Sequence, residues 1–331
     1  MSQRKRVIAS ILLFVVVFGA LLAVATVYDL QIDHILTRNT IGKDHTHIFT
    51  NDVFGTTFEI VGTLPQFFAI SFAMHILFWY GVYNFDKIKM YLTAIVTTVV
   101  SVALYNVAFS GVGGYMKDHV ALEAGVEELN IGGYLNPAFM LLAIFATVMG
   151  TFAFKSIKPE TIKKLFGFAF AMIAVMALST VIIETVKNPA GRVRYRVMNL
   201  RPDDAKYGFA AFAKWYEFGK MPMTREEKLE IYKTTEALKS FPSGHTGGAG
   251  VSYCAIMLIS ALGITDKKKK AALWIAPILW TGTVAVSRLV VGAHFFSDVL
   301  VGGTISFLSM ILAREIFILK GANIKALFGK E

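Results

Sequence analysis

The sequence of 331 residues has one cysteine, Cys254, and few charged residues, which make up 17% of the chain. A single cysteine cannot form an intramolecular disulfide, and its place inside an apolar run is typical of a small buried hydrophobe. Soluble domains rarely combine so little charge with 55% hydrophobic residues and a mean hydropathy of +0.56. The composition therefore predicts a helical protein that crosses a membrane several times.

The sequence also lacks convincing patterns for binding dinucleotides, nucleic acids or metals. No strand is predicted before the glycine-rich run 246–250, so this run is not a dinucleotide-binding fingerprint, and close helix packing explains it. The net charge of +10 is scattered between apolar spans, which argues against nucleic acid and favours anionic lipids or phosphorylated substrates. Asp44, His45 and His47 are expected to be solvated in a loop, so we predict no metal and no cofactor.

Apolar runs of about 20 residues, long enough to cross a bilayer, predict an all-α bundle of about eight transmembrane helices. The first run follows three basic residues, as in a signal peptide, but its length and the lack of a small-x-small cleavage site indicate a retained span. The predicted spans are Val7–Val27, Glu59–Tyr83, Met90–Gly111, Tyr134–Phe154, Leu165–Val186, His245–Ile264, Ala271–Val291 and Asp298–Leu319.

Lysines and arginines in the short loops predict the orientation of the bundle, because such loops are usually cytoplasmic. The basic loops alternate along the chain with loops poor in basic residues, and the alternation places both termini in the cytoplasm. The residues that carry this signal are Arg4, Lys5, Arg6, Lys87, Lys89, Lys155, Lys158, Lys163, Lys164, Lys267–Lys270, Lys320, Lys325 and Lys330.

One long loop, residues 187–244, is basic although the alternation places it outside the cytoplasm. Long loops follow the charge rule weakly, and anion binding is another reason for the charge. Within the loop, Ala205–Phe218 mixes aromatic residues with lysine and predicts a helix at the membrane interface. The capping-box pattern at Thr224–Glu227 predicts a second helix. The loop is either a solvated cover or a lid over a substrate entrance.

His294 and Asp298 are the first candidates for chemistry. Because they are four residues apart, they share one face of a helix, and the carboxylate can hold one imidazole nitrogen while the other attacks. The alternative is a structural pair that caps the helix.

Three cations near the ends of spans are candidates for binding phosphate. Arg288 would be costly at membrane depth without an anionic partner, and a guanidinium can grip two phosphate oxygens, although a snorkelling side chain is the alternative. Lys187 and Arg194 are spaced to bracket one phosphate, but they also fit a basic cluster beside the membrane. Arg192 and Arg196 are near enough to replace Arg194.

The sequence FPSGH, residues 241–245, reads as the start of a helix built to hold an anion. Pro242 and Ser243 are residues that begin helices, and Gly244 lets the main chain approach a ligand. Free amides at a helix N-terminus attract anions, and His245 would stand beside them as a proton donor. The predicted topology brings this segment to the same non-cytoplasmic end as the other candidates.

Together, the patterns Kx6R, PSGH and SRx5HxxxD resemble the phosphatidic acid phosphatase type 2 / vanadium haloperoxidase superfamily. The second and third patterns are complete, whereas Tyr195 replaces the proline that usually follows the arginine of the first. The resemblance implies a six-helix core within residues 90–331, with residues 1–89 as an additional two-helix region.

The resemblance also implies roles for the candidate residues. His294 would form a phosphohistidine, Asp298 would orient it, and His245 would protonate the leaving oxygen and then activate water. Residue spacing alone does not decide which histidine attacks, but the Asp298 partner favours His294. Fixed donors would stabilise the phosphoryl oxygens without a metal: Lys187, Arg194, Arg288, Ser243 and the Gly244 amide.

Three functions remain open at this stage. The first is an integral membrane phosphatase that hydrolyses a lipid phosphate or pyrophosphate at the outer membrane face. The second uses the same site as a phosphotransferase or as a phosphatase of soluble sugar phosphates. The third is a transporter or lipid-binding scaffold with a decayed site. The predicted partners are the bilayer and a lipid phosphate, while the identity of the lipid and the oligomeric state are not readable from the sequence.

Overall fold

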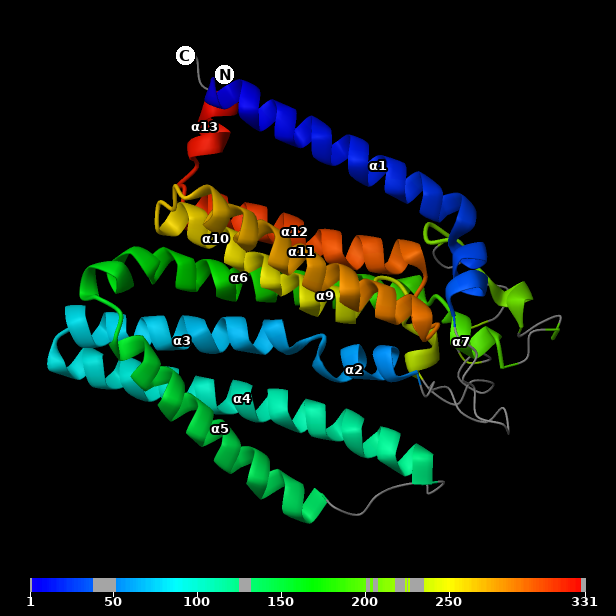
Figure 1. The fold of residues 1–331 in the computed structure, drawn as a ribbon, viewed down its shortest axis with the longest axis horizontal. Helices are drawn as coiled ribbons and strands as arrows, with labels where there is room; N and C mark the ends of the chain where they lie inside the picture. The colour runs from blue at the N-terminus through cyan, green and yellow to red at the C-terminus, as the bar shows by residue number, and fades with distance from the viewer. Residues whose placement is uncertain are drawn as a thin grey trace.

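The computed structural model describes residues 2–37, 52–124, 132–200, 203–204, 208–217, 224, 226 and 235–328. Within these ranges every regular element is a helix, so the predicted all-α bundle is confirmed (Figure 1). The long helices are α1 (Gln3–Leu36), α3 (Leu64–Asn84), α4 (Lys87–Ala124), α5 (Gly132–Lys155), α6 (Pro159–Ala190), α11 (Lys267–Val290) and α12 (Phe296–Phe317). The shorter ones are α2 (Val53–Val61), α7 (Tyr195–Met198), η1 (Phe209–Ala211), η2 (Thr235–Leu238), α9 (Gly244–Gly250), η3 (Val251–Tyr253), α10 (Cys254–Ala261) and α13 (Ala322–Phe328).

In the described part of the chain, seven helical segments are long and apolar enough to cross a membrane. The remaining predicted span, His245–Ile264, is a broken helix in which η3 joins α9 to α10. The predicted span Glu59–Tyr83 is likewise divided, because α2 ends at Val61 and α3 begins at Leu64, with Pro65 in its first turn. Proline is favoured there because the first amides of a helix have no intrahelical acceptor.

The core lies where α3, α6, α10 and α12 meet. Small side chains such as Ala73, Ala169 and Ala313 are fully buried there beside Ile256 and Met310. Small residues let helix backbones approach closely, which is how helices associate in lipid. The opposite faces of the outer helices carry exposed apolar side chains, as expected of surfaces that contact lipid.

The first helix, α1, has two different halves. Its N-terminal half exposes large apolar side chains, including Leu12, Leu13 and Val16. Only Ala25, Asp29 and Asp33 are buried along the whole helix. Helix α1 packs on α12 and α13. Its C-terminal half holds the three buried residues and also contacts Tyr195 and Trp215 through His34 and Thr26.

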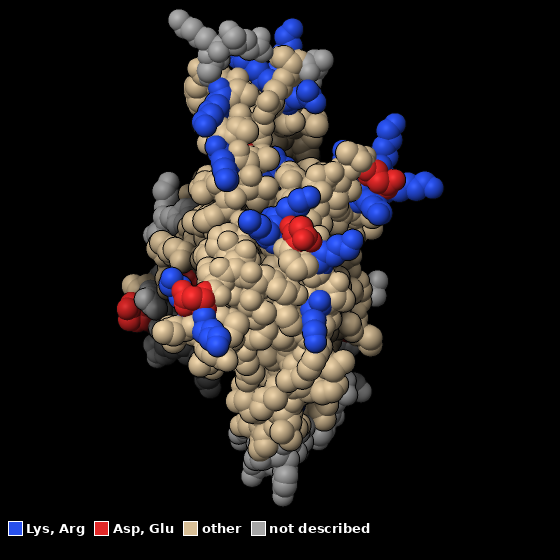
Figure 2. Space-filling view, turned by 90° about the vertical axis from the view of Figure 1, so that its left-hand side faces the viewer, with Lys and Arg blue, Asp and Glu red and all other residues tan. Residues whose placement is uncertain are grey.

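The two ends of the bundle differ in what they carry. Both chain termini lie at one end, and α7 with its connecting segments lies at the other (Figure 1). Figure 2 faces the end with the termini and shows mainly Lys and Arg among its charged side chains. The basic loops that predict the orientation therefore gather at one end, opposite the three motifs.

One predicted helix of the long loop differs from the structure, and another falls mostly outside the described residues. The predicted helix Ala205–Phe218 is wrong: of the described residues 208–217, only η1 is helical, as a single 3-10 turn. The Trp215 indole donates to Thr26 Oγ1 at 2.9 Å, and Phe212 packs on Phe295, so contacts with distant segments fix an irregular path. Most of the predicted helix that begins at Thr224–Glu227 lies outside the described residues, as do Asp44, His45 and His47.

Candidate functional site

Main-chain hydrogen bonds join the three motifs into one structure. The segments 191–196, 237–243 and 292–298 donate to and accept from one another. These bonds run from Ser240 N to Arg192 O (3.1 Å), Arg194 N to Ala237 O (3.0 Å), Arg196 N to Gly292 O (2.8 Å) and Ser243 N to Asp298 O (3.0 Å). The convergence predicted from loop charges is thus present in the fold.

Two glycines and one tyrosine shape these segments locally. Gly191 ends α6 with φ of 53° and Gly292 turns the chain after α11 with φ of 61°, a left-handed conformation that favours glycine. Tyr195 is the first residue of α7, after the N-cap Arg194. A proline suits this first position, because its missing N–H has no intrahelical acceptor there. Tyr195 therefore occupies a position compatible with the family's proline.

A cavity of about 490 Å³ opens among α3, α4, α6 and α9. Five of the predicted site residues line it: Lys187, Arg194, Gly244, His245 and His294. The rest of the wall is largely apolar, with Leu64, Phe67, Val107, Ala108, Met176 and Ile183 among its residues. The cavity thus combines a cationic, histidine-bearing part with a wall of membrane-spanning helices.

His294 is buried, and its ring is held in one orientation. Its Nδ1 lies 2.6 Å from the main-chain carbonyl of Ser240. A carbonyl oxygen can only accept, so Nδ1 carries the proton and Nε2 keeps a free lone pair. Burial, and the positive charges of Arg194 and Lys187, lower the pKa of His294 to about 4. The imidazole is therefore neutral at neutral pH and able to act as a nucleophile.

Asp298 lies behind His294 but is not its closest partner. Its Oδ2 is 3.8 Å from His294 Nδ1, too far for a hydrogen bond, although the two groups are close enough to interact electrostatically. The same oxygen accepts from the Ser240 hydroxyl at 2.5 Å and from the Phe295 amide at 2.8 Å. Asp298 therefore reaches the imidazole mainly through Ser240, so the expected direct hydrogen bond is replaced by an indirect contact, and Asp298 also caps the helix through the Phe295 amide.

Ser240 is a residue that the sequence reasoning missed. It lies one residue before FPSGH, and its contribution to His294 comes from a main-chain carbonyl. Any residue type has such a carbonyl, so no sequence pattern points to it. Its hydroxyl contact with Asp298 depends on the fold that joins the two segments.

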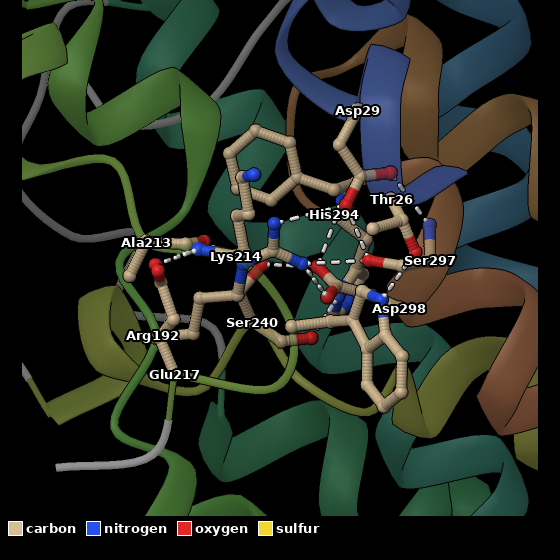
Figure 3. Close-up of polar contacts among 12 residues, drawn as sticks. Thr26, Asp29, Arg192, Ala213, Lys214, Glu217, Ser240, His294, Ser297 and Asp298 are labelled. Carbon is tan, nitrogen blue, oxygen red and sulfur yellow. Dashed lines mark hydrogen bonds and ion pairs between the residues drawn. The ribbon is translucent and has the colours of Figure 1, made fainter. Parts of the chain in front are cut away.

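The three arginines of KNPAGRVR have different surroundings. Arg194 lines the cavity, whereas Arg192 is buried between Asp29 and Asp298 (Figure 3). Arg196 is buried with Nη1 at 4.0 Å from Glu59. Of the alternatives that the sequence left open, Arg194 is the one placed beside Lys187 and His294 to meet a substrate.

Arg288 is fully buried and does not line the cavity. Its Nη1 lies 3.1 Å from Glu59 Oε1, and its Nη2 donates to the Gly55 carbonyl at 2.5 Å. The anionic partner that a membrane-depth arginine needs is therefore a carboxylate of α2 in this structure. Phosphate binding by Arg288 stays a prediction, and Glu59 would have to yield part of its contact.

The FPSGH segment begins α9, with Ser243 as its N-cap. The buried Ser243 hydroxyl accepts from the Thr246 amide at 3.3 Å, so it serves the helix rather than lining the cavity. A Cβ on Gly244 would lie 2.7 Å from Lys187 Nζ. The missing side chain thus lets the ammonium group sit against the start of α9, where helix amides favour an anion.

His245 faces the cavity from the next position of α9. Its Nε2 is 3.4 Å from the hydroxyl of Tyr115, a residue of α4 that also lines the cavity. Tyr115 had no signal in the sequence, because it follows the predicted span Met90–Gly111 and belongs to none of the motifs. The pair places a proton donor and acceptor beside the cationic group.

One comparison with known proteins finds a match. The model of the PAP2 superfamily matches residues 139–320, which confirms the predicted resemblance. No curated protein and no solved structure matches the chain. Among the described residues, no group of three or more His, Cys, Asp or Glu side chains is arranged to hold a metal ion.

Proposed function

Because the chain belongs to the PAP2 superfamily, a family of phosphatases, we propose that it hydrolyses a lipid phosphate or pyrophosphate through a phosphohistidine on His294. The observation that carries the lipid part is the cavity, whose apolar wall continues from the cationic residues along α3, α4 and α6. An acyl or prenyl chain fits such a wall while its phosphate meets Lys187 and Arg194.

The proposed chemistry uses residues on opposite sides of the phosphate. His294 Nε2 attacks phosphorus while the bond to the leaving oxygen breaks, and Nδ1 keeps its proton against the Ser240 carbonyl. His245 gives a proton to the leaving oxygen and then accepts one from the water that cleaves the phosphohistidine. Lys187, Arg194 and the amides at the start of α9 stabilise the phosphoryl charge.

Purified protein in detergent micelles, with a chelator present, is expected to release phosphate from at least one lipid of a panel. The panel contains phosphatidic acid, phosphatidylglycerol phosphate, diacylglycerol pyrophosphate and a polyprenyl pyrophosphate, with glucose 6-phosphate as the soluble comparison. Equal turnover of the soluble ester would contradict the lipid preference, and transfer of phosphate to an added alcohol would favour the phosphotransferase.

The histidine is tested by two variants. His294→Ala is expected to lower kcat by roughly 10³-fold or more, because it removes the attacking nitrogen. His75→Gln is the matched control: His75 is equally buried, but it contacts Thr151 and Tyr105 between helices and does not line the cavity. Full turnover by His294→Ala would exclude the proposed mechanism.

A further inference from the structure

Asp29 of α1 belongs to a buried network of polar side chains next to His294. Residue 29 lies far outside the segment 139–320 that matches the family model. Asp29 is buried, and its Oδ2 lies 3.0 Å from Arg192 Nη2. Its Oδ1 accepts from the Ser297 amide at 2.8 Å, and its Oδ2 accepts from the Ser297 hydroxyl at 2.5 Å. Figure 3 shows Asp29 on the side of Arg192 opposite the main chain of Ala213.

A carboxylate is unexpected on a helix whose other half exposes apolar side chains. A buried carboxylate is costly unless a group of opposite charge or hydrogen-bond donors compensate for it. Here the partner is Arg192, which also bonds Ala213 O through Nε at 2.9 Å and lies over the Phe295 ring at 4.1 Å. The guanidinium is thus held on several sides, and Asp29 is one of its two anionic partners.

Arg192 connects Asp29 to the catalytic histidine. Its Nη1 donates to Asp298 Oδ1 at 2.6 Å, and the other oxygen of Asp298 holds the Ser240 hydroxyl. The Ser240 carbonyl then accepts from His294 Nδ1. A continuous series of hydrogen bonds and ion pairs therefore joins Asp29 to His294. The site is buried, where such interactions are strong.

The charges of this network fit the reaction. Arg192 with two carboxylates carries a net charge of −1 when all three groups are ionised. When Nε2 bonds to phosphorus and Nδ1 keeps its proton, the imidazole ring becomes cationic, and a nearby negative charge stabilises it. Without Asp29, Arg192 and Asp298 together would carry no net charge. Arg192 could then pull the Asp298 carboxylate away from the Ser240 hydroxyl.

We propose that Asp29 is a positioning residue for the reaction at His294: it holds Arg192, and through Arg192 it fixes Asp298 and the Ser240 carbonyl. The proposal rests on the proposed function of His294. It gives the additional N-terminal helix a role in catalysis beyond anchoring. Asp29 does not line the cavity, so its effect reaches the reaction only through these residues.

The test compares Asp29→Asn with Asp33→Asn, using p-nitrophenyl phosphate as a probe that needs no knowledge of the lipid. Asp33 is a matched control, since it is equally buried on the same face of α1 but its carboxylate has no hydrogen-bond partner. Asp29→Asn is expected to lower kcat about 10- to 100-fold with little change in KM, the size expected for a misplaced catalytic group. Asp33→Asn is expected to keep kcat within about threefold, and equal losses in the two variants would overturn the proposal.

A double-mutant cycle tests the route. If Asp29 acts through Asp298, then Asp29→Asn is expected to have little further effect on kcat in an Asp298→Asn background. Additive losses would overturn the route through Asp298. If Asp29→Asn does not fold, Asp29→Glu takes its place: it keeps the charge but moves the carboxylate, and wild-type kcat in that variant would contradict positioning.

The activities of the wild type and of Asp29→Asn distinguish a wrong proposed function from a wrong role for Asp29. A wild-type protein that hydrolyses the probe alongside an equally active Asp29→Asn variant contradicts the inference alone. A wild-type protein that hydrolyses neither probe nor lipid contradicts the function. In that case the second measurement uses vanadate, which binds an attacking histidine as a phosphate mimic. Asp29→Asn is expected to reduce the rise in thermal midpoint that vanadate produces. An equal rise in the variant and the wild type would overturn the inference.

Discussion

At the scale of single residues, the state of His294 depends on main-chain and buried groups rather than on the motif itself. The Ser240 carbonyl fixes the proton on Nδ1, and burial keeps the ring neutral. The neighbouring cations Arg194 and Lys187 act in the same direction, since each disfavours a protonated imidazole. The residues that would bind phosphate thus also keep the nucleophile unprotonated.

The lowered pKa of His294 predicts that activity is retained down to an unusually acidic pH. The pKa of His294 is lowered to about 4, below the ordinary value of 6.5, so the ring stays neutral until the pH falls through about 4. We expect the enzyme's acidic limb of kcat/KM near pH 4. Measurements with two phosphate esters of different second pKa separate this limb from that of the substrate, because only the substrate limb moves between esters. An enzyme limb near 6.5 would contradict a buried, neutral His294.

At the scale of elements, the short helix α2 supplies the counter-charge for an arginine of α11. Glu59 and Arg288 are both almost fully buried, at 5% and 0% side-chain exposure. Removing one partner of a buried ion pair leaves an uncompensated charge and costs about 3–5 kcal/mol. Glu59→Gln is therefore expected to lower the thermal midpoint markedly in detergent.

An anion that reaches Arg288 should compensate for the lost carboxylate. We expect vanadate to raise the thermal midpoint of Glu59→Gln by more than it raises that of the wild type. Asp86→Asn is the comparison, because Asp86 does not line the cavity and pairs with Lys89 at 2.9 Å while 55% exposed, and exposed pairs contribute about 0–1 kcal/mol. An equal vanadate shift in Glu59→Gln and wild type would mean that Arg288 does not bind the phosphate.

The sequence predicted most of the spanning helices but not the polar contacts between them. Hydrophobic run length is a strong signal for spanning helices, and the motif histidines and Lys187 could be placed from loop charges. Asp29 and Glu59 could not be assigned, because the sequence does not indicate which residue pairs with a single carboxylate near the end of an apolar run. The predicted helix Ala205–Phe218 failed because local composition carries no information on the contact of Trp215 with α1.

At the scale of the whole molecule, the two ends of the bundle have opposite characters. The termini and the lysine-rich turns share one end, and α7 lies at the other (Figures 1 and 2). Arg194, which directly precedes α7, lines the cavity with Lys187 and His294. Positive charge in short loops is retained in the cytoplasm, so the proposed orientation places the termini inside and the site outside. A lipid phosphate would then be hydrolysed at the outer leaflet.

Cysteine labelling in intact cells tests this orientation, because the native Cys254 is buried and gives little background. Tyr216→Cys places an exposed thiol in the segment 208–217 of the long loop, and Ser156→Cys places one in the turn between α5 and α6. An impermeant maleimide is expected to label Tyr216→Cys in intact cells and Ser156→Cys only after the membrane is permeabilised. The reverse pattern would place the site in the cytoplasm, and hydrolysis at the outer leaflet would then be excluded.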